Sequence, residues 1–192
     1  MRVIAGRAGG VRLFAPKRGV RPTMDRVKAA IFSGLGEMVI GAHVLDLFAG
    51  SGALGVEALS RGAEFAVFVE EDRQSVETIK KNLARAKLTA HVRQQDVFRF
   101  LKSAGALGDK FTIIFADPPY DKLKSGERFT GKLLADPNLP ALLEENGWFI
   151  LEKRPSEKVP DTKNWNLTRR KTYGATEVLF LSAIPNPQAA SQ

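Results

Sequence analysis

Apolar and polar positions follow two different periods along most of this chain. Short runs rich in β-branched and aromatic residues predict buried strands, and longer stretches with apolar residues at helical spacing separate them. The predicted strands span residues 42–48, 65–70, 89–95, 111–116 and 148–153, and the predicted helices span residues 53–61, 73–86, 96–104 and 130–145. Strands and helices that alternate in this way favour an α/β fold with a doubly wound, mostly parallel sheet.

Both ends of the chain depart from this alternation. The strings RVIAG and VRLFAP, around a glycine turn, predict a short hairpin, and a stiff basic linker joins it to a helix capped by Thr23. After residue 153, the strings WNLTRRKTY and EVLFLSAI predict an antiparallel hairpin. We therefore expect a basic hairpin and linker over residues 1–22, one α/β domain over residues 23–184, and a disordered tail over residues 185–192.

Positive charge is concentrated at the N-terminus. The first 28 residues hold eight bases and one acid, a net charge of +7 out of the formal +8 of the whole chain. The bases are Arg2, Arg7, Arg12, Lys17, Arg18, Arg21, Arg26 and Lys28, and the acid is Asp25. A basic arm beside a nearly neutral body predicts a polyanionic partner, most simply a nucleic acid. The alternative is a solvated basic surface without a specific partner.

Composition excludes several function classes. The chain has no cysteine, which excludes disulfides and thiolate chemistry, and its two histidines, His43 and His91, are too few and too scattered for a histidine-based metal site. We expect no metal and a structural role for His43. No apolar run approaches the roughly 18 residues of a membrane span, and the N-terminus lacks a signal-peptide core, so we expect a cytoplasmic protein without a membrane partner.

A glycine-rich loop follows the first strand of the alternating region. In DLFAGSGALG, residues 46–55, the glycines stand between a predicted strand and a predicted helix, where backbone N–H groups can approach a ligand closely. Gly50, Gly52 and Gly55 match the pattern G-x-G-x-x-G, and Glu70 follows at the spacing of the dinucleotide fingerprint. Taken literally, the pattern leaves an NAD(P)-dependent oxidoreductase open.

Acidic residues at successive strand ends favour a different cofactor. Asp46 stands four residues before the first glycine, where it would face a cationic group instead of a pyrophosphate. Glu70 ends the next predicted strand and Asp96 follows the one after it, and three such carboxylates suit the ammonium, sulfonium, ribose and adenine of S-adenosylmethionine. Alternatively, Asp96 caps its helix, and Glu70 with Asp72 forms a solvated loop.

The predicted strand 111–116 ends on Asp117, Pro118, Pro119 and Tyr120. This motif lies on the same edge of the sheet as the glycine loop. Two prolines make the turn rigid, so that the Asp117 carboxylate and a backbone carbonyl can accept the N–H groups of an exocyclic amine and orient its lone pair toward a methyl donor. Tyr120 offers a ring on which a base can stack. The alternative is a turn that only ends the strand.

Together, DLFAGSG and DPPY resemble the class I amino-methyltransferases, which have a Rossmann-like fold. The longer strings RVIAG, RPTMDRV and DLFAGSGALGVEALSRGA resemble the bacterial 16S ribosomal RNA guanine-N2 methyltransferases that act on guanine 966 of the small subunit. The resemblance runs in order from Arg2 to about Leu181. It implies transfer of a methyl group from S-adenosylmethionine to 16S rRNA, within the small subunit or an assembly intermediate.

The resemblance also implies roles for individual residues. It places cofactor contacts at Asp46, Phe48, Ala49, Gly50, Ser51, Gly52, Glu70, Asp72, Asp96 and Val97. It assigns binding of the target amine to Asp117, Pro118, Pro119 and Tyr120, and the mouth of the site, where RNA enters, to Arg21, Thr23 and Arg26. An N6-adenine methyltransferase would use the same four-residue motif, and a binding module that has lost its activity is a further alternative.

Overall fold

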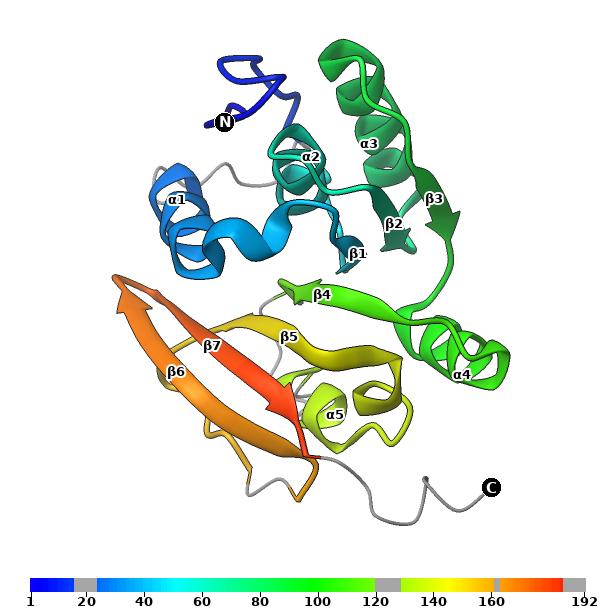
Figure 1. Ribbon diagram of the computed structural model, residues 1–192, viewed down its shortest axis with the longest axis vertical. Helices are drawn as coiled ribbons and strands as arrows, with labels where there is room; N and C mark the ends of the chain where they lie inside the picture. The colour runs from blue at the N-terminus through cyan, green and yellow to red at the C-terminus, as the bar shows by residue number, and fades with distance from the viewer. Residues whose placement is uncertain (16–23, 120–128, 161–162, 185–192) are drawn as a thin grey trace.

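The computed structural model describes residues 1–15, 24–119, 129–160 and 163–184. Its strands form a seven-stranded sheet in the order β3-β2-β1-β4-β5-β7-β6 (Figure 1). The strands are β1 (His43–Leu47), β2 (Phe65–Glu70), β3 (His91–Gln94), β4 (Phe111–Ala116), β5 (Leu143–Lys153), β6 (Trp165–Tyr173) and β7 (Thr176–Ala183). β1 to β5 run parallel, and β7 is antiparallel to both β5 and β6. The predicted doubly wound sheet and its antiparallel end are confirmed.

Helices cover both faces of the sheet. They are α1 (Met24–Leu35), α2 (Ala53–Ser60), α3 (Arg73–Ala86), α4 (Val97–Leu107) and α5 (Phe129–Ala135), with short 3-10 turns η1 (Gly36–Val39) and η2 (Pro140–Leu142). Because side chains alternate along a strand, Val44 packs with α1, α2 and α3, whereas Leu45 and Leu47 pack with α4 and α5. Asp46 therefore lies on the same face as Val44, toward α2.

The first fifteen residues form a loose hairpin that packs on the domain. A single antiparallel bridge joins Arg2 and Arg12, and the amide of Val3 donates to Val11 at 2.9 Å. Val3, Ala8 and Leu13 are buried in the same core as α1, α2 and α3. We call residues 1–15 the N-terminal arm. The rest of the predicted linker, residues 16–22, and the predicted tail, residues 185–192, lie outside the described residues.

The helix predicted over residues 130–145 is wrong beyond Ala135. Pro137 disfavours helical geometry at Asp136, and the Asp136 carboxylate accepts the amide hydrogens of Asn138 and Leu139, which closes a turn. The chain then enters β5 at Leu143, five residues earlier than the strand predicted from residue 148. The apolar residues between are buried as expected, but they pack from a 3-10 turn and a strand.

Candidate functional site

The strand order brings the loops after β1 and β4 together at the centre of the sheet. The last residues of these strands, Leu47 and Ala116, are paired. From β1 the chain proceeds outward to β2 and β3 and then returns to β4 on the other side, so the strand order reverses between β1 and β4. Open α/β sheets bind ligands outside the carboxyl ends of the strands at such a reversal. The glycine loop and the DPPY motif both begin there.

The glycine loop turns through left-handed backbone geometry. Phe48, Gly50 and Gly52 have φ angles of 54°, 55° and 75°. A Cβ at Gly52 would lie 3.1 Å from the ring of Phe68, so this glycine lets the loop pack against β2. Among the described residues, a Cβ at Gly50 would meet only the Phe48 carbonyl oxygen, at 3.9 Å. With respect to those residues, a ligand can approach the backbone at Gly50.

Asp46, the penultimate residue of β1, carries a buried carboxyl group and is 2% exposed. Its Oδ2 accepts the amide hydrogen of Gly55 at 2.9 Å. The pKa of Asp46 is raised from 3.8 to about 8, mainly by burial; the hydrogen bond from Gly55 opposes the rise, and the charges of Asp117 and Glu70 add to it. At neutral pH this carboxyl group is mainly protonated, and a cationic ligand beside it would favour the charged form.

Glu70 connects the end of β2 to the glycine loop. Its Oε2 accepts the amide hydrogen of Gly50 at 2.8 Å, and its Oε1 accepts that of Asp72 at 2.9 Å. Both Glu70 oxygens are thus bonded to the backbone, whereas the alternative interpretation placed Glu70 in a solvated loop. A carboxylate that accepts two backbone hydrogen bonds keeps lone pairs for further donors, such as the hydroxyl groups of a ribose.

The other two predicted acids cap helices. Asp72 caps α3 by accepting the amide hydrogen of Ser75 at 2.8 Å, and Asp96 caps α4 by accepting that of Arg99 at 2.9 Å. Val97 begins α4 and is buried. The capping geometry considered for Asp96 is therefore present. Both carboxylates lie at the same edge of the sheet, at the starts of α3 and α4.

The DPPY motif is described as far as Pro119. Asp117 is half-buried, Pro118 is buried and Pro119 is exposed. Leu47 pairs with Ala116, so Asp46 and Asp117 lie at the ends of adjacent strands, and the charge of Asp117 raises the pKa of Asp46. Tyr120, Arg21 and Thr23 lie outside the described residues. Arg26 is exposed on the first turn of α1.

Sequence reasoning missed an aromatic cluster at this edge. The ring of Phe48 lies 5.3 Å from that of Phe129 and 6.4 Å from that of Phe98, and the last two rings are stacked at 6.4 Å. All three side chains are half-buried. They come from the glycine loop and from the starts of α4 and α5, so no local pattern connects them. They pack on the α4 and α5 face of the sheet, next to the glycine loop.

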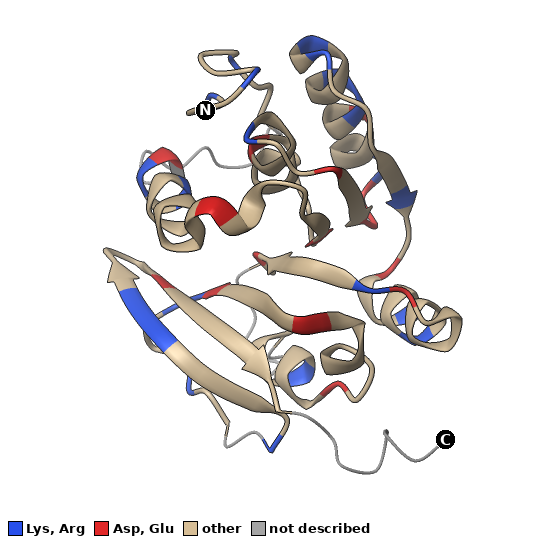
Figure 2. Ribbon diagram, in the orientation of Figure 1, with Lys and Arg blue, Asp and Glu red and all other residues tan. Residues whose placement is uncertain are grey.

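The described bases of the N-terminus are exposed as expected, with one exception. Lys28 does not contribute to an exposed basic arm, because it is 3% exposed and its Nζ lies 3.1 Å from a Glu57 carboxylate oxygen. Further exposed bases occur on β6, including Arg170 and Lys171, near its carboxyl end (Figure 2). The strand registers place Arg170 level with Ala116, three strands away, or about 14 Å.

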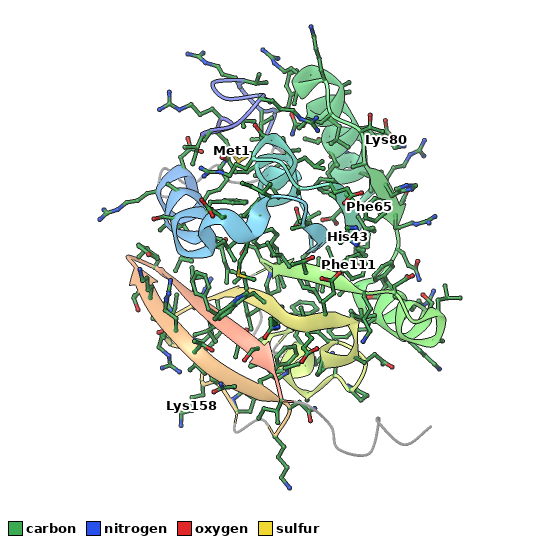
Figure 3. All side chains as sticks on the ribbon, viewed as in Figure 1. Met1, His43, Phe65, Lys80, Phe111 and Lys158 are labelled. Atoms are coloured by element: carbon green, nitrogen blue, oxygen red, sulfur yellow. The ribbon has the colours of Figure 1, made fainter. Side chains whose placement is uncertain are left out.

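The opposite edge of the sheet holds both histidines. His43, Phe65 and Phe111 begin β1, β2 and β4 and lie close together (Figure 3), and His43 is 3.8 Å from both Glu64 and Glu144. Within the described ranges, no group of three or more His, Cys, Asp or Glu is arranged to hold a metal ion. In the same ranges, no helix is long and apolar enough to cross a membrane.

Comparisons with known proteins agree with this geometry. Residues 1–182 match the family model described as conserved hypothetical protein 95. The chain is 41% identical to a candidate rRNA methyltransferase of Bacillus subtilis, over 93% of this chain and 96% of that protein. It is 37% identical to ribosomal RNA small subunit methyltransferase D of Escherichia coli, over 91% of this chain and 85% of that protein.

A solved structure gives a direct view of ligands on a similar fold. It is a 16S rRNA guanine-N2 methyltransferase of Thermus thermophilus in complex with S-adenosylmethionine and guanosine, and it superposes on this chain with a TM-score of 0.67 and 28% identity. The match covers 86% of this chain and 44% of that protein.

Proposed function

We propose, because the chain belongs to the conserved hypothetical protein 95 family, that it transfers a methyl group from S-adenosylmethionine to the exocyclic N2 amine of a guanine in small-subunit 16S rRNA. The observation that carries this proposal is the meeting of three carboxyl groups, those of Asp46, Glu70 and Asp117, at the strand reversal beside an open glycine loop. The names of the relatives indicate the class of substrate, and the residues of the site support the transfer of a methyl group.

The residues at the site fit this cofactor. The open backbone at Gly50 allows close approach, and Asp46 with Glu70 would hold cationic and hydroxyl groups, which a pyrophosphate does not offer. Bound S-adenosylmethionine supplies an electrophilic methyl group. A nicotinamide dinucleotide would place a doubly anionic group among these carboxyl groups, which disfavours the oxidoreductase alternative.

Asp117 orients the target amine. An exocyclic amine is a poor nucleophile because its lone pair is delocalised into the ring. The Asp117 carboxylate accepts one N–H of the amine and, with a backbone carbonyl of the rigid proline turn, directs the lone pair out of the ring plane. Orientation of this kind contributes several kcal/mol to a displacement, and Tyr120 stacks the base.

The RNA reaches this pocket from the carboxyl edge of the sheet. The guanine leaves its stack, and basic side chains hold the flanking phosphates. Arg26 is exposed on the first turn of α1, and Arg170 and Lys171 are exposed on β6, level with the end of β4. We assign Arg21 and Thr23, which lie outside the described residues, to RNA binding as well. The substrate is the assembled small subunit or an assembly intermediate, in the cytoplasm, and the chemistry uses no metal.

Labelled S-adenosylmethionine tests this proposal. The protein is incubated with small subunits from cells that lack its gene, and the RNA is digested to nucleosides. We expect label in N2-methylguanosine. Label in N6-methyladenosine would retain the mechanism and overturn the substrate. Absence of label, with cofactor binding shown by titration, would identify a binding module or a different substrate. Binding of a nicotinamide cofactor instead would favour the oxidoreductase.

A further inference from the structure

Asn82 is a fully buried polar residue on α3 that the proposed reaction does not use. Its side chain is 0% exposed. Its Nδ2 donates to the Phe14 carbonyl at 3.0 Å and to the Ser51 carbonyl at 2.9 Å, and its Oδ1 accepts the Phe14 amide hydrogen at 2.7 Å. Both amide donors therefore meet carbonyl oxygens and the acceptor meets an N–H, which fixes the orientation of the carboxamide. One side chain thus joins the N-terminal arm, α3 and the glycine loop.

The bond to Ser51 fixes one peptide plane of the glycine loop. The amide of Gly52 donates to Ala49 at 2.7 Å, and the carbonyl on the same peptide plane, that of Ser51, accepts from Asn82. Glu70 holds the Gly50 amide on the other side of the loop. The orientation of the backbone groups that would meet a cofactor thus depends on Asn82.

The bonds to Phe14 fix the end of the arm. The backbone of Phe14 pairs with the carboxamide through both its N–H and its carbonyl, and its ring lies 4.9 Å from the Arg85 guanidinium, also on α3. The start of the arm meets the same loop, because Met1 Sδ lies 3.9 Å from Ser51 Oγ and Met1 is placed beside α2 (Figure 3). The packing of the arm on the domain, which we call its seating, and the conformation of the loop therefore depend on the same contacts.

We propose that Asn82 is a positioning residue that couples seating of the N-terminal arm to cofactor binding at the glycine loop. The proposal rests on the proposed function, which assigns the loop to the cofactor, and it adds RNA contacts for the arm, whose Arg2, Arg7 and Arg12 are exposed. When the arm is seated, Asn82 is held in the orientation that fixes the Ser51 peptide plane. By thermodynamic reciprocity, a cofactor that orders the loop also seats the arm, and RNA bound to the arm tightens cofactor binding.

The test compares two buried residues that both hold the arm. Asn82→Leu keeps a similar volume and removes the contacts to both the arm and the loop. Ser60→Ala is the control: Ser60 Oγ donates to the Ala5 carbonyl at 2.6 Å and accepts the Ala8 amide hydrogen at 2.9 Å, but Ser60 ends α2, two turns from the loop. Calorimetric titration with S-adenosylmethionine is performed at a temperature at which circular dichroism shows both variants folded.

We expect Asn82→Leu to raise the dissociation constant of the cofactor about tenfold, the scale of a lost buried hydrogen bond, and Ser60→Ala to change it less than about twofold. The same cofactor dissociation constant in both variants, whether unchanged from the wild type or raised, would overturn the coupling. A wild-type chain that binds no cofactor would overturn the proposed function and this inference together, so the two failures are distinguishable.

A measurement on the wild-type chain decides the matter even if Asn82→Leu does not fold. Hydrogen exchange is followed at the amides of residues 11–15 with and without S-adenosylmethionine. Coupling predicts that the cofactor slows exchange in this segment about fivefold or more, although the segment is outside the cofactor site. Exchange that is unchanged in the arm while it slows in the glycine loop would refute the proposal.

Discussion

Replacing Asp46 by Asn should make the cofactor-free protein less sensitive to alkaline pH while weakening its cofactor binding. The asparagine has the shape of the aspartate and keeps an oxygen for the Gly55 amide hydrogen, so the packing at the end of β1 is preserved. Only the ionisable proton is lost. The substitution therefore separates the cost of burying the Asp46 charge from every other role of the residue.

The magnitude follows from the raised pKa. The native carboxyl group holds its proton up to about pH 8, whereas the unfolded one releases it near 3.8. Its contribution to stability is therefore fully present below pH 3.8 and is lost as the pH rises through 8. For one proton, the free energy of unfolding changes by at most about 1.36 kcal/mol over each pH unit. Between pH 7 and pH 9, the free energy of unfolding of the wild type should fall by about 1.4 kcal/mol more than that of Asp46→Asn.

Urea denaturation of the cofactor-free proteins at pH 6, 7, 8 and 9 measures this difference. Asp109→Asn, at an exposed aspartate, is the control and should parallel the wild type. Titration with S-adenosylmethionine in two buffers of different ionisation enthalpy should show proton release in the wild type at pH 7 and none in Asp46→Asn. Parallel stability profiles of the wild type and Asp46→Asn would refute the assignment of the raised pKa to this buried carboxyl group.

Four changes test other parts of the site and its supports. Asp117→Ala should abolish single-turnover methyl transfer and leave the cofactor dissociation constant nearly unchanged; a normal rate would refute the role of the DPPY motif. Gly55→Ala should lower the free energy of unfolding, measured by thermal denaturation, by about 1–3 kcal/mol, because the new Cβ would lie 2.4 Å from a ring carbon of Phe68 on β2. Glu57→Gln should lower the free energy of unfolding, measured in urea, by about 3–5 kcal/mol, because it leaves the buried Lys28 ammonium without its counter-charge. The control Glu77→Gln, at an exposed position, should leave the free energy of unfolding unchanged. Alanine at both Arg170 and Lys171 should lower the slope of log affinity against log salt for RNA by roughly one per contact, and an unchanged slope would remove β6 from the RNA surface.

Local patterns were sufficient for most of the elements. The strands over residues 65–70 and 111–116 were predicted with their observed bounds, because each is a run of apolar and β-branched residues between turn signals. The helix predicted over residues 130–145 failed because periodicity alone does not separate a buried helix from a buried 3-10 turn and strand. There, the proline geometry after Asp136 and the pairing of Leu143 with Phe111 decided the outcome.

The sequence by itself determined the chemistry: a glycine loop, acids at successive strand ends and a rigid DPPY turn are local strings, and their residue types limit what they can bind. The tertiary structure decided how they act together. Strand order brings Asp46, Glu70 and Asp117 to one edge, and burial raises the pKa of Asp46, which depends on atoms far apart in the chain. Folding also buries Lys28 against Glu57, places Arg170 level with the end of β4, and joins the arm to the loop through Asn82. Such contacts are set by packing and strand register, which no local pattern encodes.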